Sequence, residues 1–371
     1  MAKQNGNICY IVSNAFLFSD KAQRLRNFIL KKAPIQNIVN FERYSVFESA
    51  MITTAIVNFK KNENNLITRA LTLKDGTKND FTSIINDKQN FIEVILKPDS
   101  VFALVNGEAV GLNSKIDANK TLLVQLVLVG KGMETAANEV FSNNEITNQG
   151  FSIDFLRKRL NGKAIKKYSI DKTLTDDMLY FEHVDTFENL PQSIQKYLFL
   201  NKSILGNRAT VRNENRIWWR YSRPMHKEFY QLNKIWTSYR SAYNCFAFDD
   251  AKEYIGLTNT TVIFDTNSKV VSLKYILALV NSKLLDYRYK SIGKQTGGGI
   301  YEYFENGISK LPIAVISSFN QSIFISLVDE ILSAKHDDPK ADTRVLEKEI
   351  DRLVYELYGL TEEEIKIVEG N

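Results

Sequence analysis

The interpretation of this sequence depends on the stretch from Arg208 to Arg240, which reads RATVRNENRIWWRYSRPMHKEFYQLNKIWTSYR. Arginines are interspersed with aromatic residues along it. A guanidinium group neutralises phosphate and can donate two hydrogen bonds to one guanine edge, whereas a flat ring can stack on a base. The stretch therefore favours nucleic-acid binding. The alternative is a core in which each tryptophan is buried and the arginine side chains extend around it.

Charge is unevenly distributed along the chain. The formal net charge of the 371 residues is only +5. Between Lys202 and Arg240 there are nine basic and two acidic residues, whereas residues 321–371 hold six basic and thirteen acidic ones. Because a polyanion responds to local charge rather than to the average, we expect the central segment to bind it and the acidic segment to stay away from it.

The composition, with 44% hydrophobic and 25% charged residues, is that of a globular protein with two or three domains. No apolar run approaches the roughly 20 residues that cross a bilayer, and the N-terminus lacks the sections of a signal peptide. We therefore expect a cytoplasmic protein that does not enter a membrane. Cys9 and Cys245 are expected to stay reduced.

The first 60 residues have the pattern of the edge of an α/β sheet. Short β-like runs lie at Ile8 to Val12, Ile38 to Phe41 and Ile52 to Phe59, and residues 21–32 carry apolar side chains at helical spacing. Three strands and one helix cannot enclose a core. We expect this part to pack against the next domain or against a further N-terminal portion.

Short β-like segments and then helices are predicted for the rest of the chain. Residues 91–96 have the composition of a strand, and residues 121–129 form an apolar run of strand length. Near the end, Gly359 is a natural helix stop, and Thr361 with Glu364 spells a capping box. The last 50 residues are therefore predicted to be helical.

Few residues have the spacing of a catalytic centre. The three histidines and two cysteines lie too far apart for zinc ligands or a nucleophile pair. Gly130 and Gly132 follow a predicted strand, as in a dinucleotide-binding turn, although Thr135 stands where that turn has its third glycine. A dinucleotide-dependent enzyme that uses these two glycines is therefore one alternative.

Several motifs occur in a fixed order along the chain. GNICYIVSNAFL from Gly6, RLRNFIL from Arg24 and VFESAMITTAIV from Val46 resemble the strands and helix that follow the catalytic motif of adenine-N6 DNA methyltransferases. GMETAANEVF from Gly132 is similar to the start of the TaqI-like C-terminal specificity domain in that family, which includes the type IIG restriction-modification enzymes. WWRYSRP from Trp218 resembles a later landmark of the same domain.

The resemblance implies methyl transfer to adenine, with S-adenosylmethionine as the cofactor of the complete enzyme. The family's catalytic loop is Asn or Asp followed by Pro-Pro and an aromatic residue, whereas the six prolines here stand alone. The glycine-rich cofactor turn is also missing. We therefore expect that this chain alone binds no cofactor and lacks methyl transfer. Phe47 matches the phenylalanine that helps to stack the flipped base, or is simply a core residue.

The expected fold is an α/β fragment, the end of a Rossmann-like methyltransferase sheet, followed by an α+β DNA specificity domain and a C-terminal helical tail. The expected boundaries are 1–62 for the catalytic-domain edge, 63–120 for a connecting region, 121–315 for the target-recognition domain and 316–371 for the tail. The expected partner is double-stranded DNA. The candidate DNA-contacting residues are Arg208, Arg212, Arg216, Trp218, Trp219, Arg220, Tyr221, Arg223, Lys234, Arg240, Lys131, Thr135, Asn138 and Lys294.

A second hypothesis is a split methyltransferase. In that case the unfinished N-terminal sheet is the docking edge for a partner that supplies the cofactor turn and the catalytic loop. No nuclease motif stands out, so DNA cleavage is not predicted.

Overall fold

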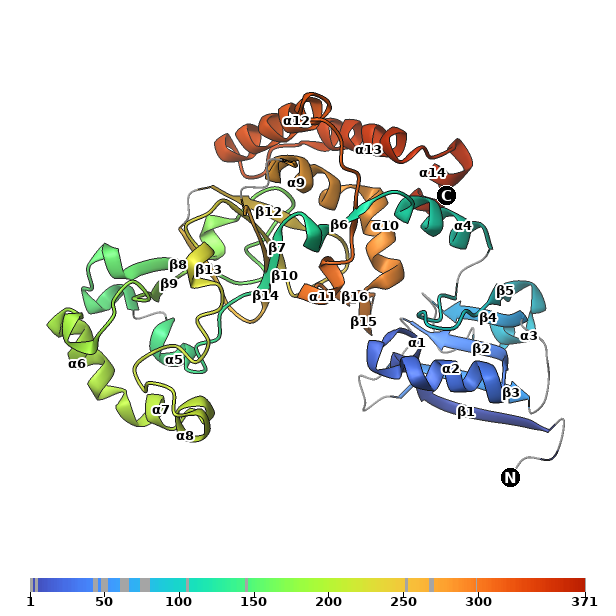
Figure 1. The fold of residues 1–371 in the computed structure, drawn as a ribbon, viewed down its shortest axis with the longest axis horizontal. Coiled ribbons are helices and arrows are strands. Elements are labelled where there is room, and N and C mark those ends of the chain that lie inside the picture. Colours follow the sequence, from blue (N-terminus) through green and yellow to red (C-terminus); the bar gives the residue numbers. More distant parts are fainter. Residues whose placement is uncertain are drawn as a thin grey trace.

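The computed structural model describes residues 3, 6–42, 46–47, 53–60, 67–73, 81–104, 107–143, 146–250, 253–266, 270–297 and 299–370. Figure 1 shows an arc: an N-terminal domain at one end, a central body with the C-terminal helices along its outer side, and a lobe that carries α5 to α8 at the other end.

The N-terminal domain is built on a five-stranded sheet of order β1-β3-β2-β4-β5, in which β2 and β4 run parallel and the other neighbours antiparallel. Leu17 and Ile29 from the helices on one face pack against Ile38 of β2. The next residue, Val39, points to the opposite face, because side chains alternate along a strand. The elements are β1 (Asn7–Ser13), α1 (Ala15–Phe18), α2 (Gln23–Lys32), β2 (Ile35–Phe41), β3 (Thr54–Lys60), β4 (Ile67–Leu73), α3 (Phe81–Asn86) and β5 (Ile92–Ile95).

The sequence predicted β1, α2, β2, β3 and β5, but not β4. Ile52, the first residue of the predicted third strand, lies outside the described residues. β4 adds to β2 in parallel and buries Ala70 and Leu71. The sheet therefore continues into residues for which the sequence predicted a connecting region, since it extends to β5 at Ile95.

A four-stranded antiparallel sheet of order β12-β10-β14-β7 forms the centre. Ile235 and Ile263 face the helical side, whereas Trp236 and Val262 face the lobe. The sheet thus separates two cores. Its strands and the helices on its helical side are α4 (Gly107–Asp117), β7 (Leu128–Lys131), β10 (Lys234–Ser238), β12 (Phe246–Asp249), β14 (Thr260–Phe264), α9 (Leu273–Asn281) and α10 (Lys283–Ile292).

The lobe and the rim consist of smaller elements. The lobe contains α5 (Asn138–Phe141), β8 (Leu156–Leu160), β9 (Asp176–Leu179), α6 (Gln192–Leu200), α7 (Lys202–Gly206), α8 (Ala209–Glu214) and β13 (Tyr254–Gly256), with β8 between β13 and β9. The rim has β11 (Arg240–Ser241), β15 (Lys294–Gly297), β16 (Ile300–Glu302) and α11 (Glu305–Ile308), and β6 (Thr121–Leu122) pairs with β17 (Pro312–Ile313).

The helical prediction for the C-terminus is confirmed by α12 (Ser318–Asp337), α13 (Arg344–Tyr358) and α14 (Glu362–Glu369). Gly359 ends α13 at a φ of 69°, and Thr361 and Glu364 form the predicted capping box. Ile350 of α13 packs into the same core as α9, so these helices are part of the central body rather than a separate tail.

The prediction of one strand across residues 121–129 is wrong. The run breaks into β6, a 3₁₀ turn at Leu123–Gln125, and β7. Leu123 is fully buried, and its N–H donates to the Leu311 carbonyl at 2.9 Å. Burial in the central core accounts for Leu123, Val127 and Val129, whereas Leu122 and Val124 are 42% and 52% exposed. In the described part of the chain, no helix is long and apolar enough to span a bilayer.

Candidate nucleic-acid interface

Arg208 was predicted to contact DNA but is a structural residue. It is 5% exposed, and its guanidinium donates to the carbonyls of Leu205 (2.9 Å), Thr135 (2.8 Å), Trp218 (2.6 Å) and Arg220 (2.7 Å). Burial lowers its pKa. These bonds hold the Trp218–Arg220 loop against the segment before α5, so the prediction of DNA contact is corrected for this arginine.

Lys234 is likewise internal. It is fully buried on β10, lies 3.3 Å from an Asp249 carboxylate oxygen and donates to the Tyr230 carbonyl at 2.8 Å. The Trp236 indole N–H donates to the same Asp249 oxygen at 3.0 Å. The prediction that Lys234 contacts DNA is therefore corrected, because this ammonium neutralises a buried carboxylate.

The double tryptophan motif belongs mostly to the lobe core. Trp219 is 5% exposed and Tyr221 is 2% exposed, and their rings lie 5.7 and 5.0 Å from that of Phe181. Arg220 lies over the Trp219 ring at 4.1 Å and donates to the Asp185 carbonyl at 2.7 Å. For Trp219, Arg220 and Tyr221, the core alternative is the one that the structure supports.

Trp218 occupies an intermediate position. It is half-buried, and its ring lies 5.5 Å from those of Phe187 and Phe199. The Lys202 ammonium lies 5.2 Å from the same ring. Trp218 therefore shapes the surface of the lobe without being enclosed in it.

The remaining predicted cations are exposed, and we call them the basic strip. They lie on α8, on the loops that follow it, on β7 and on the rim sheet. In Figure 1, α5 and α8 of the lobe and β15 of the rim lie along the inner side of the arc. The members of the basic strip are Arg212, Arg216, Arg223, Lys131, Arg240 and Lys294.

At the lobe end of the basic strip, two carboxylates pair with the arginines. Arg223 donates to Glu214 at 2.8 Å, and Arg216 lies 3.8 Å from the same carboxylate. The Arg223 guanidinium also lies 3.8 Å from the Glu134 carboxylate. The backbones of these two residues form an isolated antiparallel β-bridge. The strip therefore continues from α8 to the segment that follows β7.

A shared carboxylate also organises the rim end. Glu302 on β16 lies 3.4 Å from Arg240 on β11 and 2.6 Å from Lys294 on β15. Glu302 itself is 5% exposed, whereas both cations keep more than half of their side-chain surface exposed. The two cations are thereby held side by side at the surface.

Lys131, the member of the basic strip on β7, lines two hollows of the surface. One, of about 470 Å³, also includes Thr135 and Asn138, and the other, of about 300 Å³, includes Tyr239 and Phe304. Thr135 is only 2% exposed and its Oγ1 lies 2.5 Å from Asn138 Oδ1, so the prediction of direct DNA contact is corrected for Thr135. Asn138 is exposed next to it.

The two glycines of the dinucleotide alternative have a packing role. A Cβ on Gly130 would lie 2.5 Å from His226 Nε2, and one on Gly132 would lie 2.1 Å from the Leu257 carbonyl oxygen. Gly130 pairs with Val262 within the sheet, rather than opening a helix. Close packing thus accounts for both glycines, and the geometry does not favour a dinucleotide site. Among the described residues, no group of three or more His, Cys, Asp or Glu could hold a metal ion.

Phe47 is 43% exposed, which does not fit the alternative that it is a core residue. Residues 48–52 of the motif that suggested its role lie outside the described part of the chain.

The acidic C-terminal helices do not neutralise the basic strip. Their carboxylates pair with other lysines: Glu364 with Lys115 at 2.6 Å, and Glu347 with Lys167 at 2.7 Å. Figure 1 places α12, α13 and α14 on the outer side of the arc. The segregation of charge expected from the sequence is therefore present in the fold.

Sequence reasoning missed the carboxylates that position these cations. Glu134 and Glu302 are far from the basic stretch in sequence, and only their pairing in the fold shows that they face it. Tyr239 belongs to the basic stretch, but only the fold shows that it lines a hollow with Lys131.

Two family models match parts of the chain. Residues 157–313 match the family described as TaqI-like C-terminal specificity domain, and residues 1–47 match the Eco57I restriction-modification methylase family. Both matches confirm the resemblance seen in the sequence. The specificity-domain match lies within the predicted range of 121–315.

The fold is similar to that of one solved restriction-modification enzyme. The chain is similar to the type IIL restriction-modification enzyme MmeI, solved in complex with DNA, with a TM-score of 0.67 at 13% identity over 98% of this chain and 48% of that one. A similarity to the type IIG restriction endonuclease BpuSI has a TM-score of 0.43 at 12% identity, over 96% of this chain and 47% of that one. The chain thus spans about half the length of these two enzymes.

Proposed function

We propose that this chain recognises a target sequence in double-stranded DNA for an adenine-N6 DNA methyltransferase of a restriction-modification system. The observation that carries the proposal is the exposed basic strip, whose members Arg212 and Lys294 belong to α8 and β15 on the inner side of the arc. Three carboxylates, Glu134, Glu214 and Glu302, hold most of its members in place without burying them. Cations fixed in this way contact phosphate at a smaller cost in side-chain entropy.

In this proposal, the cations position the duplex, and other groups read the bases. Asn138 is exposed beside Lys131 in the larger hollow, and asparagine can pair with the edge of an adenine. Trp218, half-buried on the lobe, offers a flat surface to the sugar-phosphate backbone. The complex of MmeI with DNA supports this assignment by similarity of fold.

The N-terminal domain is, in this proposal, the end of a Rossmann-like catalytic sheet. The match of residues 1–47 to a methylase family supports it. S-adenosylmethionine is the cofactor that such an enzyme uses, and we propose that residues outside this chain hold it. Methyl transfer to the amino group of adenine is then the reaction that the recognition step serves.

Selection from a pool of random duplexes tests this function. We expect the chain to enrich one short sequence motif. The variant Arg223→Ala should weaken binding to that motif, whereas Arg344→Ala on α13, whose side chain is 82% exposed, should not. Enrichment of no motif, or equal losses for both variants, would contradict target recognition.

A second candidate function, that of a subunit in a split methyltransferase, is favoured by the outer surface of the N-terminal domain. β1 is the edge strand of its sheet, and Tyr10 and Ile11 on it are 59% and 47% exposed. Phe28 on α2 is 62% exposed. An open edge with exposed apolar side chains is a docking surface for another polypeptide.

The candidate partner is a polypeptide with the cofactor turn and an Asn-Pro-Pro-Tyr loop. Co-expression of the two chains should yield a complex that methylates adenine, and the double variant Tyr10→Glu, Phe28→Glu should abolish the complex. Replacement of two exposed residues on α12, Phe319→Glu and Ile323→Glu, is the matched control. A complex that survives the β1 and α2 changes would rule out docking at this surface.

A further inference from the structure

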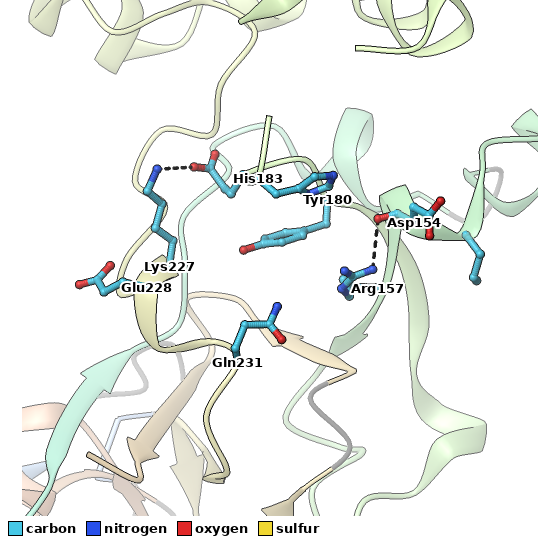
Figure 2. A pocket seen from close by; sticks show the side chains of 9 residues that line it. Asp154, Arg157, Tyr180, His183, Lys227, Glu228 and Gln231 are labelled. Atoms are coloured by element: carbon cyan, nitrogen blue, oxygen red, sulfur yellow. Dashed lines mark hydrogen bonds and ion pairs between the residues drawn. The ribbon is translucent and has the colours of Figure 1, made fainter. Parts of the chain in front are cut away.

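The lobe contains a hollow of about 750 Å³ that none of the basic strip residues line. Figure 2 shows its walls: Arg157 on β8, Tyr180 and His183 after β9, and Lys227 with Gln231 on the loop that leads to β10. This volume lies within the range of about 300–1,000 Å³ that is usual for small-molecule sites.

Glu182 lies at one side of this hollow with an unsatisfied oxygen. Its side chain is 3% exposed, and its Oε2 lies 3.6 Å from the Lys227 ammonium and 3.8 Å from the Arg220 guanidinium. Its Oε1 is buried and accepts no hydrogen bond from the described residues. Burial raises the pKa of this carboxyl in spite of the two cations. A buried acceptor without a donor is costly, so a ligand that supplies an N–H donor would be stabilised here.

An aromatic ring lies between the two cations of the hollow. In Figure 2 the Tyr180 ring lies between Lys227 and Arg157, and only 6% of this residue is exposed. The guanidinium carbon of Arg157 is 5.7 Å from the centre of this ring, and its Nη1 donates to the Leu156 carbonyl at 2.7 Å. Rings and guanidinium planes are the groups on which proteins stack bases.

We propose that this hollow binds a nucleotide whose base carries an exocyclic amino group. The amino group donates to Glu182 Oε1, the base lies against the Arg157 guanidinium, and the phosphate lies near Lys227. The same chemistry fits a nucleotide extruded from bound DNA and a free nucleotide, and only the first source rests on the proposed recognition of DNA.

Calorimetric titration of the full chain with dAMP, dCMP, dGMP and dTMP tests the site itself. At least one of the three amino-bearing nucleotides should bind at least tenfold more tightly than dTMP. The variant Glu182→Met should lose at least about tenfold in affinity, since a hydrogen bond to a charged acceptor contributes about that much. Glu228→Gln, at an exposed position of the same hollow, is the control and should bind as the parent does.

If Glu182→Met does not fold, Arg157→Gln supplies the second variant and should weaken the same nucleotide. Absence of nucleotide binding by the parent chain, or equal binding by the parent and the folded Glu182 or Arg157 variant, overturns the proposal.

A duplex with 2-aminopurine in place of adenine at each position of the bound site distinguishes the two sources. A rise in fluorescence that Glu182→Met removes assigns the site to an extruded base, whereas nucleotide binding without such a rise assigns it to a free nucleotide. The variant Arg212→Gln, Arg216→Gln should weaken duplex binding and leave mononucleotide binding unchanged. A failure of DNA recognition is thereby separated from a failure of this site.

Discussion

Replacing Arg212 and Arg216 with glutamine should reduce the salt dependence of DNA binding. Both are exposed on or just after α8, and Arg216 has only a 3.8 Å contact with Glu214. If all six members of the basic strip contact phosphate, the slope of log K against log salt is about −5.4, and the loss of two contacts brings it to about −3.6. Six contacts are the upper limit, because the carboxylates partly neutralise the strip.

These slopes translate into large differences in affinity. Between 50 and 200 mM salt the parent chain should lose about 2,000-fold in affinity and the double variant only about 150-fold. Fluorescence anisotropy of a labelled duplex, titrated at four salt concentrations, measures both slopes. The reasoning is refuted if the two slopes are equal, or if the control Arg344→Gln, Arg352→Gln on α13 changes the slope as much.

The other predictions concern stability and thiol reactivity. Lys234→Met should destabilise the chain by about 3–5 kcal/mol in urea unfolding, because it leaves the Asp249 carboxylate buried without its cation. Adding Asp249→Asn should recover much of this loss. If the double variant is no more stable than Lys234→Met, the pairing is contradicted. Arg208→Ala should lower the free energy of unfolding by about 3 kcal/mol or more, because several buried carbonyls lose their donor. A change within about 0.5 kcal/mol would show that the residue is not structural. Burial raises the pKa of Cys245 to about 11, so at pH 8 only about one of these thiols in a thousand is ionised. Mass spectrometry after alkylation of the folded chain should therefore find the exposed Cys9 modified and Cys245 intact. Equal modification of both thiols in the folded chain would show that Cys245 is accessible.

Periodicity was enough to predict the elements whose neighbours are close in sequence. The stripe on α13, the stop at Gly359 and the capping box at Thr361 depend on residues within one or two helical turns. β4 was missed because its place in the sheet depends on parallel pairing with β2, which no local pattern records.

The candidate site was predicted as a region but not residue by residue. The composition of the basic stretch is the same whether an arginine is exposed, as Arg212 is, or holds carbonyls inside the lobe, as Arg208 does. Burial decides between these roles, and it depends on contacts such as that of Arg208 with Thr135, 73 residues away. A single sequence therefore indicates the charge of the surface, whereas the fold selects which charges reach it.

Amide hydrogen exchange of the chain with and without a duplex that carries its selected motif tests the central claim most directly. We expect slower exchange in residues 128–143, 209–223 and 294–297 when the duplex is bound, with no change in α12 to α14. Protection of the C-terminal helices, with exchange along the basic strip unchanged, would contradict the claim that the inner side of the arc binds the duplex.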